Sequence, residues 1–487
     1  MHGMNRITRN AIRLWVQAGP RFLPFADVAS AELPLSRLLR LSLVQVSVGM
    51  SLVLLVGTLN RVMIVELAIP ASLVASMIAL PVLFAPFRAL IGHRSDTYRS
   101  VLGWRRVPFL FRGAMLQFGG FAVMPFALLV LAGEGESARV PALVGQVSAA
   151  IAFLLVGAGL HTTQTVGLAL ATDLCRPEQR PNMVGLMYVM LLAGAIVSAI
   201  VFGAALEDFS HGRLVQVIQA AAVASLVLNG IALWQQEPRR RGIDPDAPSD
   251  DPGFLDAWAL YMQDRASVQR LLAIGLGTMA FGMQDVLLEP YGGEILQLSV
   301  SATTRLTATL AGGGLVGFAL ASRVLSRGAD PFRMAALGGL AGIAAFAAVL
   351  LAAPLQSPML FVAGSFVVGF GGGLFGHGTL TATMNHAPKE QAGLALGAWG
   401  AVQATAAGIG VALGAVIRDA VMASPALAGA YGPVAGYSAV FAVEIALLLA
   451  AIIVMLPMLA RAPRNAAMPR QDPPRIVPHS TIGQGHG

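Results

Sequence analysis

Long apolar stretches recur along the whole chain, and short polar segments separate them. A helix needs about 20 apolar residues, at roughly 1.5 Å each, to cross ~30 Å of hydrocarbon. Several stretches contain glycine or proline, which membrane helices tolerate. The pattern predicts twelve spanning helices, at residues 41–66, 69–92, 108–132, 142–172, 183–206, 213–234, 268–290, 300–325, 333–353, 357–384, 391–418 and 434–460.

Composition supports a membrane protein and argues against an enzyme. Of the 487 residues, 56% are hydrophobic and only 12% are charged, whereas soluble proteins carry roughly 25% charged residues. The sequence has no P-loop, no Gly-x-Ser-x-Gly and no cluster of cysteines and histidines, and Cys175 is its one cysteine. The polar segments are too short for a catalytic domain, so we expect neither catalytic residues nor a metal site.

Basic residues are distributed unevenly between alternate loops. The net charge is +7, which by itself is compatible with a nucleic-acid partner. However, only five of the 32 basic residues fall on one side of the predicted membrane, namely Arg61, Arg139, Arg213, Arg305 and Arg418. This is the positive-inside bias of membrane proteins. It predicts that both termini are cytoplasmic, and it removes the reason to expect nucleic acid.

The chain divides into two related halves. A polar linker at 236–267 separates a six-span half at 41–235 from another at 268–461, with a cytoplasmic segment at 1–40 and a disordered tail at 462–487. After the fourth span comes "ATDLCRPEQRPNMVGL", and after the tenth comes "TMNHAPKEQAGLALG". Aligning Glu178 with Glu390 also aligns the two loops and the spans that follow. Two such halves predict an all-α integral membrane protein with the major facilitator superfamily fold.

The segment between the second and third spans supports this fold. Its sequence "GHRSDTYRSVLGWRR" resembles the corresponding loop of the superfamily, with a glycine, an acidic residue, a second glycine and a basic pair. These are Gly92, Asp96, Gly103, Arg105 and Arg106. The resemblance implies that the loop stabilises one conformation through charge pairs and contacts with helix ends.

A more specific resemblance covers residues 35–131 and continues more weakly through the second half. The phrases "GTLNRVMIVEL", "LFAPFRALIGHRSD" and "GWRRVP" resemble the PucC/LhaA family of purple photosynthetic bacteria, also called the bacteriochlorophyll delivery family. The resemblance implies a factor that assembles light-harvesting antenna complexes in the inner, intracytoplasmic membrane. It implies bacteriochlorophyll as cargo, and as partners antenna polypeptides together with pigment-synthesis or insertion machinery.

Two histidines at membrane depth are candidate pigment ligands. His161 lies in the fourth span and His377 in the tenth, on repeat-related helices and one helical turn apart in the alignment. A neutral imidazole is suited to ligate the magnesium of bacteriochlorophyll, and glycines around His377 give a flat surface. The alternative is that both imidazoles join closely packed helices, which glycine-rich spans also favour.

Charged residues near the ends of the first and seventh spans form a second candidate site. Arg61 and Glu66 lie in the first span, and Asp285 and Glu289 lie in the seventh. An unpaired arginine is costly in a membrane, so we expect Arg61 to pair with Asp285 or Glu289 across the two halves. Such a pair is either a gate that opens during alternating access or a static lock.

The residues leave three functions open. The first is antenna assembly with binding or delivery of bacteriochlorophyll. The second is proton-coupled secondary transport through Asp285, Glu289 or Glu66, and the third is a structural membrane scaffold. The central cavity distinguishes these functions. A polar, water-filled cavity with facing acids favours transport. An apolar, glycine-lined groove open to lipid favours pigment handling, and filled contact between the halves favours a scaffold.

Overall fold

A computed structural model describes residues 34–67, 69, 71–100, 102–133, 139–206, 208–238, 253–298, 300–387, 391–424, 426 and 432–461. Throughout these residues the regular structure is helical. Twelve helices are long and apolar enough to cross a membrane, which confirms the predicted number. The predicted cytoplasmic segment falls mostly outside the described residues, and the predicted disordered tail falls entirely outside them.

The N-terminal half contains the first six spans. Their elements are α2 (Leu35–Leu52), η2 (Val53–Thr58), α3 (Leu59–Arg61), η3 (Val62–Glu66), α4 (Ala71–Leu83), η4 (Ala85–Phe87), α5 (Arg88–Thr97), α6 (Val107–Ala132), α7 (Ala142–Leu174), η6 (Pro177–Gln179), α8 (Arg180–Ala205) and α9 (His211–Leu233). The segments η2 and η3 are π-helical, so the conspicuous "GTLNRVMIVEL" sequence lies in a region of irregular helix. π-Helical turns are rare in proteins, and those that occur are often found at functional sites.

The C-terminal half contains the other six spans, preceded by a short helix. Its elements are α10 (Phe254–Gln263), α11 (Arg265–Met283), η7 (Gln284–Val286), α12 (Leu288–Glu294), α13 (Val300–Leu325), α14 (Pro331–Ala352), α15 (Pro358–His386), α16 (Ala392–Met422) and α18 (Val434–Arg461). The helix α10 falls within the predicted linker. It packs beside the second span, where the rings of Phe254 and His93 lie 5.8 Å apart.

The second span differs from its prediction at both ends. Its apolar helical segment runs from Ser76 to Thr97 rather than over 69–92. Pro81 lies inside α4, and a 3-10 turn at Ala85–Phe87 joins α4 to α5. The polar end remains helical because α5 packs against α16, which buries Gly92 and Asp96. Both residues therefore lie in a helix rather than in a loop.

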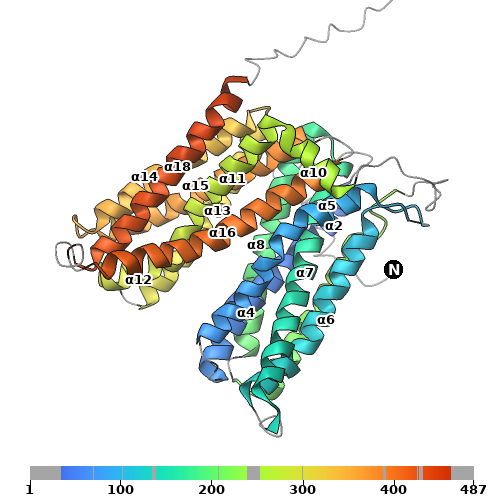
Figure 1. Cartoon of the computed structure of the whole chain (residues 1–487), viewed down its shortest axis with the longest axis horizontal. Coiled ribbons are helices and arrows are strands. Elements are labelled where there is room, and N and C mark those ends of the chain that lie inside the picture. The colour runs from blue at the N-terminus through green and yellow to red at the C-terminus, as the bar shows by residue number, and fades with distance from the viewer. Residues whose placement is uncertain are drawn as a thin grey trace, which may run out of the picture.

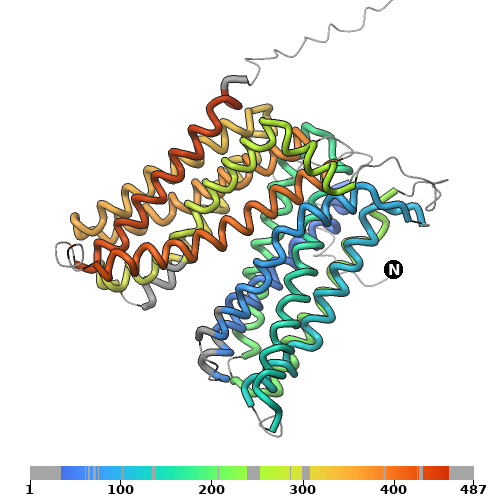
Figure 2. The backbone as a smooth tube through the Cα atoms, in the orientation of Figure 1, coloured from blue at the N-terminus to red at the C-terminus, as the bar shows by residue number. Residues whose placement is uncertain are grey.

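The two halves form separate bundles that meet at one end. Figure 1 shows them in contact near α5, α10 and α8, and diverging towards the ends of α4 and α12. Figure 2 traces the first bundle from blue to green and the second from yellow-green to red. The junction lies on the side of the arginine-rich segment between the second and third spans. We call this side the closed side and the other the open side.

Each bundle has its own interior. One apolar cluster fills the open-side part of the N-terminal half and another fills that of the C-terminal half. A polar network also joins helices of the first bundle. Ser47 donates to Gln117 Oε1 at 3.0 Å, Gln117 donates to Thr163 at 2.7 Å, and Asn229 donates to Ser47 at 2.9 Å. Interhelical hydrogen bonds of this kind hold membrane bundles together.

Candidate functional site

The carboxylate of Asp96 joins the second span to the eleventh. Its Oδ1 accepts a hydrogen bond from the backbone N–H of Gly393 at 2.9 Å, and its Oδ2 accepts one from that of Leu394 at 2.8 Å. Both N–H groups belong to the first turn of α16, where no partner exists within the helix. The helix dipole also favours an anion here. Asp96 therefore caps a helix of the opposite half.

Two arginines surround this carboxylate. Arg106 Nη2 lies 2.5 Å from Asp96 Oδ1, and Arg106 Nε lies 3.0 Å from Asp173 Oδ2. Arg105 contacts the same Asp173 oxygen at 2.6 Å. Burial of the Arg106 guanidinium lowers its pKa, but Asp96 and Asp173 outweigh this effect and raise that pKa overall. Arg106 therefore stays charged between two carboxylates, and the basic pair predicted from sequence serves this cluster.

Glu237 fixes the backbone that carries the two arginines. Its carboxylate accepts hydrogen bonds from the backbone N–H groups of Arg105 at 2.8 Å, Arg106 at 2.9 Å and Val107 at 2.9 Å. These groups precede and begin α6, where free donors favour an anion. Gly103, just before them, has a φ of +77°, which glycine adopts without strain. The segment is therefore held from the end of the sixth span.

Close contact between α5 and α16 depends on glycines. A side-chain carbon at Gly92 would overlap the backbone carbonyl of Gly393. One at Gly393 would lie 2.5 Å from Arg106 Nη1 and 2.8 Å from Asp96 Oδ1. A turn further along, a carbon at Gly397 would overlap the backbone of Arg88. The helices approach to backbone contact here, so Asp96 reaches the end of α16 directly.

Arg88 lies deeper in the same junction. Its side chain is 2% exposed. Its Nε donates to Thr165 Oγ1 at 2.8 Å, and its Nη1 donates to the carbonyl oxygen of Gly400 at 3.3 Å, while Nη2 has no hydrogen-bond partner. Among the described residues no carboxylate forms a salt bridge with it. A buried arginine without a counter-charge is expensive in a membrane and is a candidate functional residue.

A second contact between the halves mirrors the first without charges. Ser322, near the end of α13, donates to Asn182 Oδ1 at 3.0 Å, in the first turns of α8. By the alignment of the halves, Asn182 corresponds to Leu394. Nearby, the rings of Tyr188 and Phe318 stack 4.3 Å apart. The two contacts are related by the pseudo-symmetry of the halves, but only the one between α5 and α16 is ionic. Of the two helices α8 and α16, only α16 has a glycine in its first turn, and this glycine lets an acid approach.

Both candidate pigment ligands lie buried and hydrogen-bonded. His161 Nε2 lies 3.0 Å from the carbonyl oxygen of Pro81, and His377 Nε2 lies 2.9 Å from that of Pro181. A carbonyl oxygen only accepts, so each Nε2 carries the hydrogen and each Nδ1 keeps a free lone pair. Neither Nδ1 has a hydrogen-bond partner among the described residues. Pigment ligation stays a prediction, with Nδ1 as the available atom.

The candidate gate residues are described only in part. Asp285 Oδ1 accepts a hydrogen bond from Gln284 at 2.5 Å. Glu289 is exposed in α12, and Glu66 is half-buried in η3. The 3-10 segment η7 interrupts the helix between the two acids of the seventh span, so they do not share one face of a continuous helix. The side chain of Arg61 lies outside the described residues, and its predicted pairing stays a prediction.

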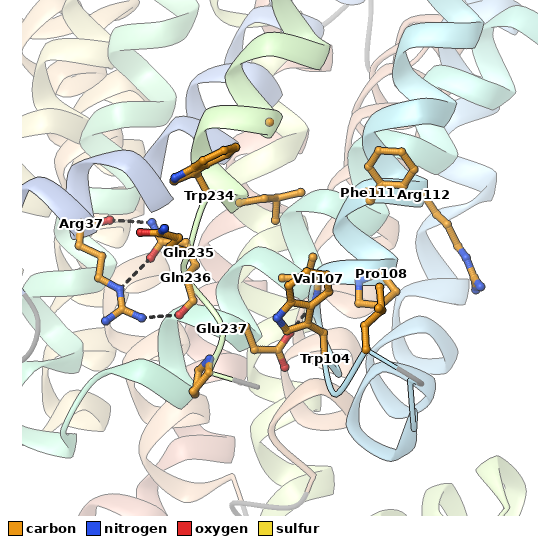
Figure 3. A pocket seen from close by; sticks show the side chains of 14 residues that line it. Arg37, Trp104, Val107, Pro108, Phe111, Arg112, Trp234, Gln235, Gln236 and Glu237 are labelled. Atoms are coloured by element: carbon orange, nitrogen blue, oxygen red, sulfur yellow. Dashed lines mark hydrogen bonds between the residues drawn. The ribbon is translucent and has the colours of Figure 1, made fainter. Parts of the chain in front are cut away.

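A large apolar groove opens on the closed side of the N-terminal half, between α6 and the end of α9. Its volume is about 880 Å³, within the ~300–1,000 Å³ range of small-molecule sites. Figure 3 shows Trp104, Trp234 and Phe111 at the groove, with Arg37 on one side and Arg112 on the other. The full lining is Arg37, Leu102, Trp104, Val107, Pro108, Phe111, Arg112, Gly230, Leu233, Trp234, Gln235, Gln236, Glu237 and Pro238.

The groove is polar at one edge and apolar elsewhere. Arg37 donates through Nη2 to the backbone oxygen of Gln236 at 2.5 Å. The guanidinium of Arg112 lies 5.7 Å from the ring centre of Phe109. The exposed fractions of Trp234 and Phe111 are 66% and 55%. Large exposed aromatic surface beside cations is typical of sites that meet an amphipathic partner at the membrane boundary.

The comparisons with known proteins decide the family. The model of the family described as "PUCC protein" matches residues 58–462. The chain belongs to the PucC family. It is 62% identical to Protein PucC of Rhodovulum sulfidophilum over 423 residues, covering 86% of this chain and 92% of that protein. It is 58% identical to Protein PucC of Cereibacter sphaeroides over 459 residues, covering 94% and 99%.

Solved structures with the same fold are transporters of the major facilitator superfamily. The fucose transporter FucP in its outward conformation matches with a TM-score of 0.62 and 15% identity, covering 88% of this chain and 99% of that one. A bacterial homologue of the iron transporter ferroportin in its outward-facing state matches with a TM-score of 0.66 and 15% identity, covering the same shares. These structures show that the chain has the major facilitator fold.

Proposed function

We propose that this protein binds bacteriochlorophyll in the apolar groove between α6 and α9 and delivers it while antenna polypeptides are inserted. The observation that carries the proposal is the groove itself. Its volume of about 880 Å³ and its tryptophan and phenylalanine walls suit a flat, apolar macrocycle. Because the groove opens at the surface of the bundle, a pigment enters from the bilayer without crossing the protein.

The polar edge of the groove supports an amphipathic cargo. Arg37 and Arg112 lie on opposite sides of it (Figure 3) and give its rim a positive charge that suits the oxygen substituents of a pigment. Trp104 and Trp234 offer ring faces for stacking, which adds to the gain from burying apolar area. An apolar tail would extend along α6 and α9 towards lipid.

The groove shares residues with the junction of the two halves. Val107 and Glu237 line it, and Glu237 also holds the backbone of Arg106 at 2.9 Å. Arg106 in turn pairs with Asp96, which caps α16 of the other half. A pigment bound in the groove would therefore contact Glu237, which holds Arg106 of the ionic cluster on the closed side. Pigment binding could in this way change the contact between the two halves.

Single substitutions in the groove test the proposal. Trp234→Ala and Phe111→Ala remove exposed rings, so we expect folding to be preserved. Ile200→Ala, also 66% exposed but on α8, is the matched control. Each variant is purified in mild detergent from a bacteriochlorophyll-making host, and pigment per protein is measured after extraction. We expect a several-fold loss for the groove variants alone. Equal pigment in all three would overturn the assignment of the groove.

Antenna polypeptides are the proposed protein partners. They are single hydrophobic chains that must receive pigment within the bilayer, so a delivery site open to lipid suits them. In a strain that lacks its own copy of this protein, the groove variants should restore less antenna absorption than the wild type does. Cross-linking from a photoreactive residue at position 234 should capture an antenna polypeptide. Capture from position 200 alone would contradict the proposal.

Transport is the second candidate, because one observation favours it. The fold is that of transporters, and Arg88 is buried between the halves without a carboxylate partner among the described residues. Such an arginine is suited to bind an anion when the closed side opens. Uptake of an anionic solute into vesicles, lost in Arg88→Met and kept in Trp234→Ala, would favour transport over pigment delivery.

A further inference from the structure

Glu444 is a fully buried acid without a hydrogen-bond partner. It lies in the middle of α18, its exposed fraction is 0%, and neither of its carboxylate oxygens has a partner among the described residues. By contrast, Asp96, Asp173 and Glu237 contact an arginine or a backbone N–H, and Asp285 and Glu289 are exposed. A buried carboxylate without such contacts is unfavourable in its charged form.

The surroundings of Glu444 on its own helix and on α14 are apolar. Phe441 lies one turn before it and Leu448 one turn after it. The rings of Phe441 and Phe346 stack 6.3 Å apart, and a side-chain carbon at Gly342 would lie 2.8 Å from Leu448. Phe441 and Leu448 both belong to the apolar core of this half. The turns of α18 before and after Glu444 are therefore packed against apolar side chains of the protein.

The end of the seventh span brings a second acid towards this part of α18. The helix α11 packs along α18, and its last residue, Met283, belongs to the same apolar core as Phe441 and Leu448. Asp285 follows two residues later and is exposed, and its negative charge disfavours a second charge on Glu444. Gln284 donates to Asp285 Oδ1 at 2.5 Å and so fixes that carboxylate. The two acids thus form a pair with one member inside the core and the other at its edge.

We propose that Glu444 and Asp285 form a proton-binding site, in which Glu444 holds the proton and Asp285 exchanges it with the outside. A neutral Glu444 leaves no buried charge in the apolar core. When the halves rearrange, the pair can lose or gain this proton. The proposal does not rest on pigment delivery, and it assigns a site to α18 rather than to the first or seventh span alone.

The remaining charged groups on neighbouring helices are engaged elsewhere. From α16, Arg418 lies 3.3 Å from Glu294 of α12 and 3.2 Å from Asp419. On α18, the hydroxyl of Tyr437 donates to the same Glu294 at 2.8 Å. On α12, Glu289 is exposed. The helix α14 contributes apolar and glycine residues to this contact, and its Arg333 lies at the helix start. On α11, Arg265 lies at the helix start and Arg270 lies 3.8 Å from Asp264, both at the other end of the helix from Asp285. Among the described residues, Asp285 is therefore the acid considered with Glu444.

Carbodiimide labelling of the full-length protein tests the proposal. Dicyclohexylcarbodiimide is apolar and modifies carboxyl groups that are protonated in membrane interiors. We expect labelling of Glu444 at neutral pH, located by peptide mass spectrometry, and none at the exposed Glu178. The labelled peptide should disappear in Glu444→Gln. If Glu444 remains unlabelled at neutral pH while the protein is folded, it is ionised and the proposal fails.

The pH dependence of labelling tests the role of Asp285. Removing its negative charge makes Glu444 easier to ionise, so Asp285→Asn should shift the midpoint of labelling to lower pH. The expected shift is about one pH unit, a tenfold change in proton affinity. Asp419→Asn, an exposed acid on the same side, is the control and should leave the midpoint in place. An unchanged midpoint in Asp285→Asn would overturn the pair. Gel filtration and circular dichroism establish that each variant is folded.

Discussion

Asp96 of the second span caps the helix that begins beside Gly393 of the eleventh, with 2.9 Å between the carboxylate and the Gly393 N–H. The two residues lie in different halves of the chain, and their contact is buried. It requires a glycine at position 393, because any larger residue would meet Asp96 and Arg106. The hydrogen bond between Asp96 and Gly393 therefore depends on the close packing of α5 against α16 on the closed side.

Asp96→Asn should weaken the closed conformation. The amide keeps one acceptor but loses the charge that pairs with Arg106 and the helix dipole. Hydrogen bonds to charged groups contribute about 1.5–3 kcal/mol, so the open population should rise roughly 10- to 100-fold. The measurement is maleimide labelling of Ser322→Cys, which lies buried at the junction, in a Cys175→Ser background.

Two controls accompany this experiment. Glu178→Gln changes an exposed acid on the same side and should leave the labelling rate at the wild-type value. Burial raises the pKa of the Cys175 thiol to about 12, so the unreplaced cysteine should react very slowly at neutral pH. A labelling rate for Asp96→Asn equal to that for Glu178→Gln would show that Asp96 does not hold the halves together.

Gly92→Ala should open the same side by steric overlap. The added methyl would collide with the Gly393 carbonyl, and neither backbone can yield without separating α5 from α16. Spin labels at Val140→Cys and Leu355→Cys, both exposed on the open side, should move closer together. Gly119→Ala, where nothing lies within 4 Å, is the matched control. Identical distance distributions for the two variants would contradict this packing.

Arg88→Met and Arg106→Met should separate function from stability. Arg106 is buried between Asp96 and Asp173. Its removal leaves these two carboxylates without a counter-charge and should lower the melting temperature, because breaking a buried ion pair costs about 3–5 kcal/mol. Arg88 pairs with no carboxylate among the described residues, and its removal should leave the melting temperature unchanged or higher. Antenna formation should nevertheless fall in Arg88→Met. Loss of stability in Arg88→Met comparable to that in Arg106→Met would give Arg88 a structural role.

Substitutions of His161 and His377 should distinguish a pigment ligand from a helix contact. In each, Nε2–H is used by a proline carbonyl and Nδ1 is free. If either ligates pigment, its change to Phe should abolish or shift the bacteriochlorophyll absorption band of the purified protein. His377→Asn is the companion variant, because it retains a donor for Pro181. An unaltered band in all variants would limit both histidines to packing.

The spans were predictable because apolar length is a local property of the sequence. The exception is the end of the second span, where "GHRSDT" is polar and yet helical. Its burial comes from α16, which is about 300 residues away in the chain, so no local pattern reveals it. The breaks in the first and seventh spans were missed for a related reason, since "GTLNRVMIVEL" and "GMQDVLLEP" keep the hydrophobicity of ordinary helices.

The site was predictable only where a motif marked it. The order of Gly92, Asp96, Arg105 and Arg106 indicated a conformational cluster, but not its partners. Asp173 and Gly393 lie within the repeated segments that identified the duplication, which was the one available signal. Glu444 carried none, because a single acid in an apolar span shows its meaning only once its neighbours are known.

The central claim is that this PucC-family protein carries bacteriochlorophyll in its closed-side groove. Its most direct test is the absorption spectrum and extracted pigment of the wild-type protein, purified in mild detergent from a pigment-making host, beside Trp234→Ala. The account predicts near-stoichiometric bacteriochlorophyll in the wild type and a several-fold loss in the variant. A wild-type protein that is folded and colourless would contradict it.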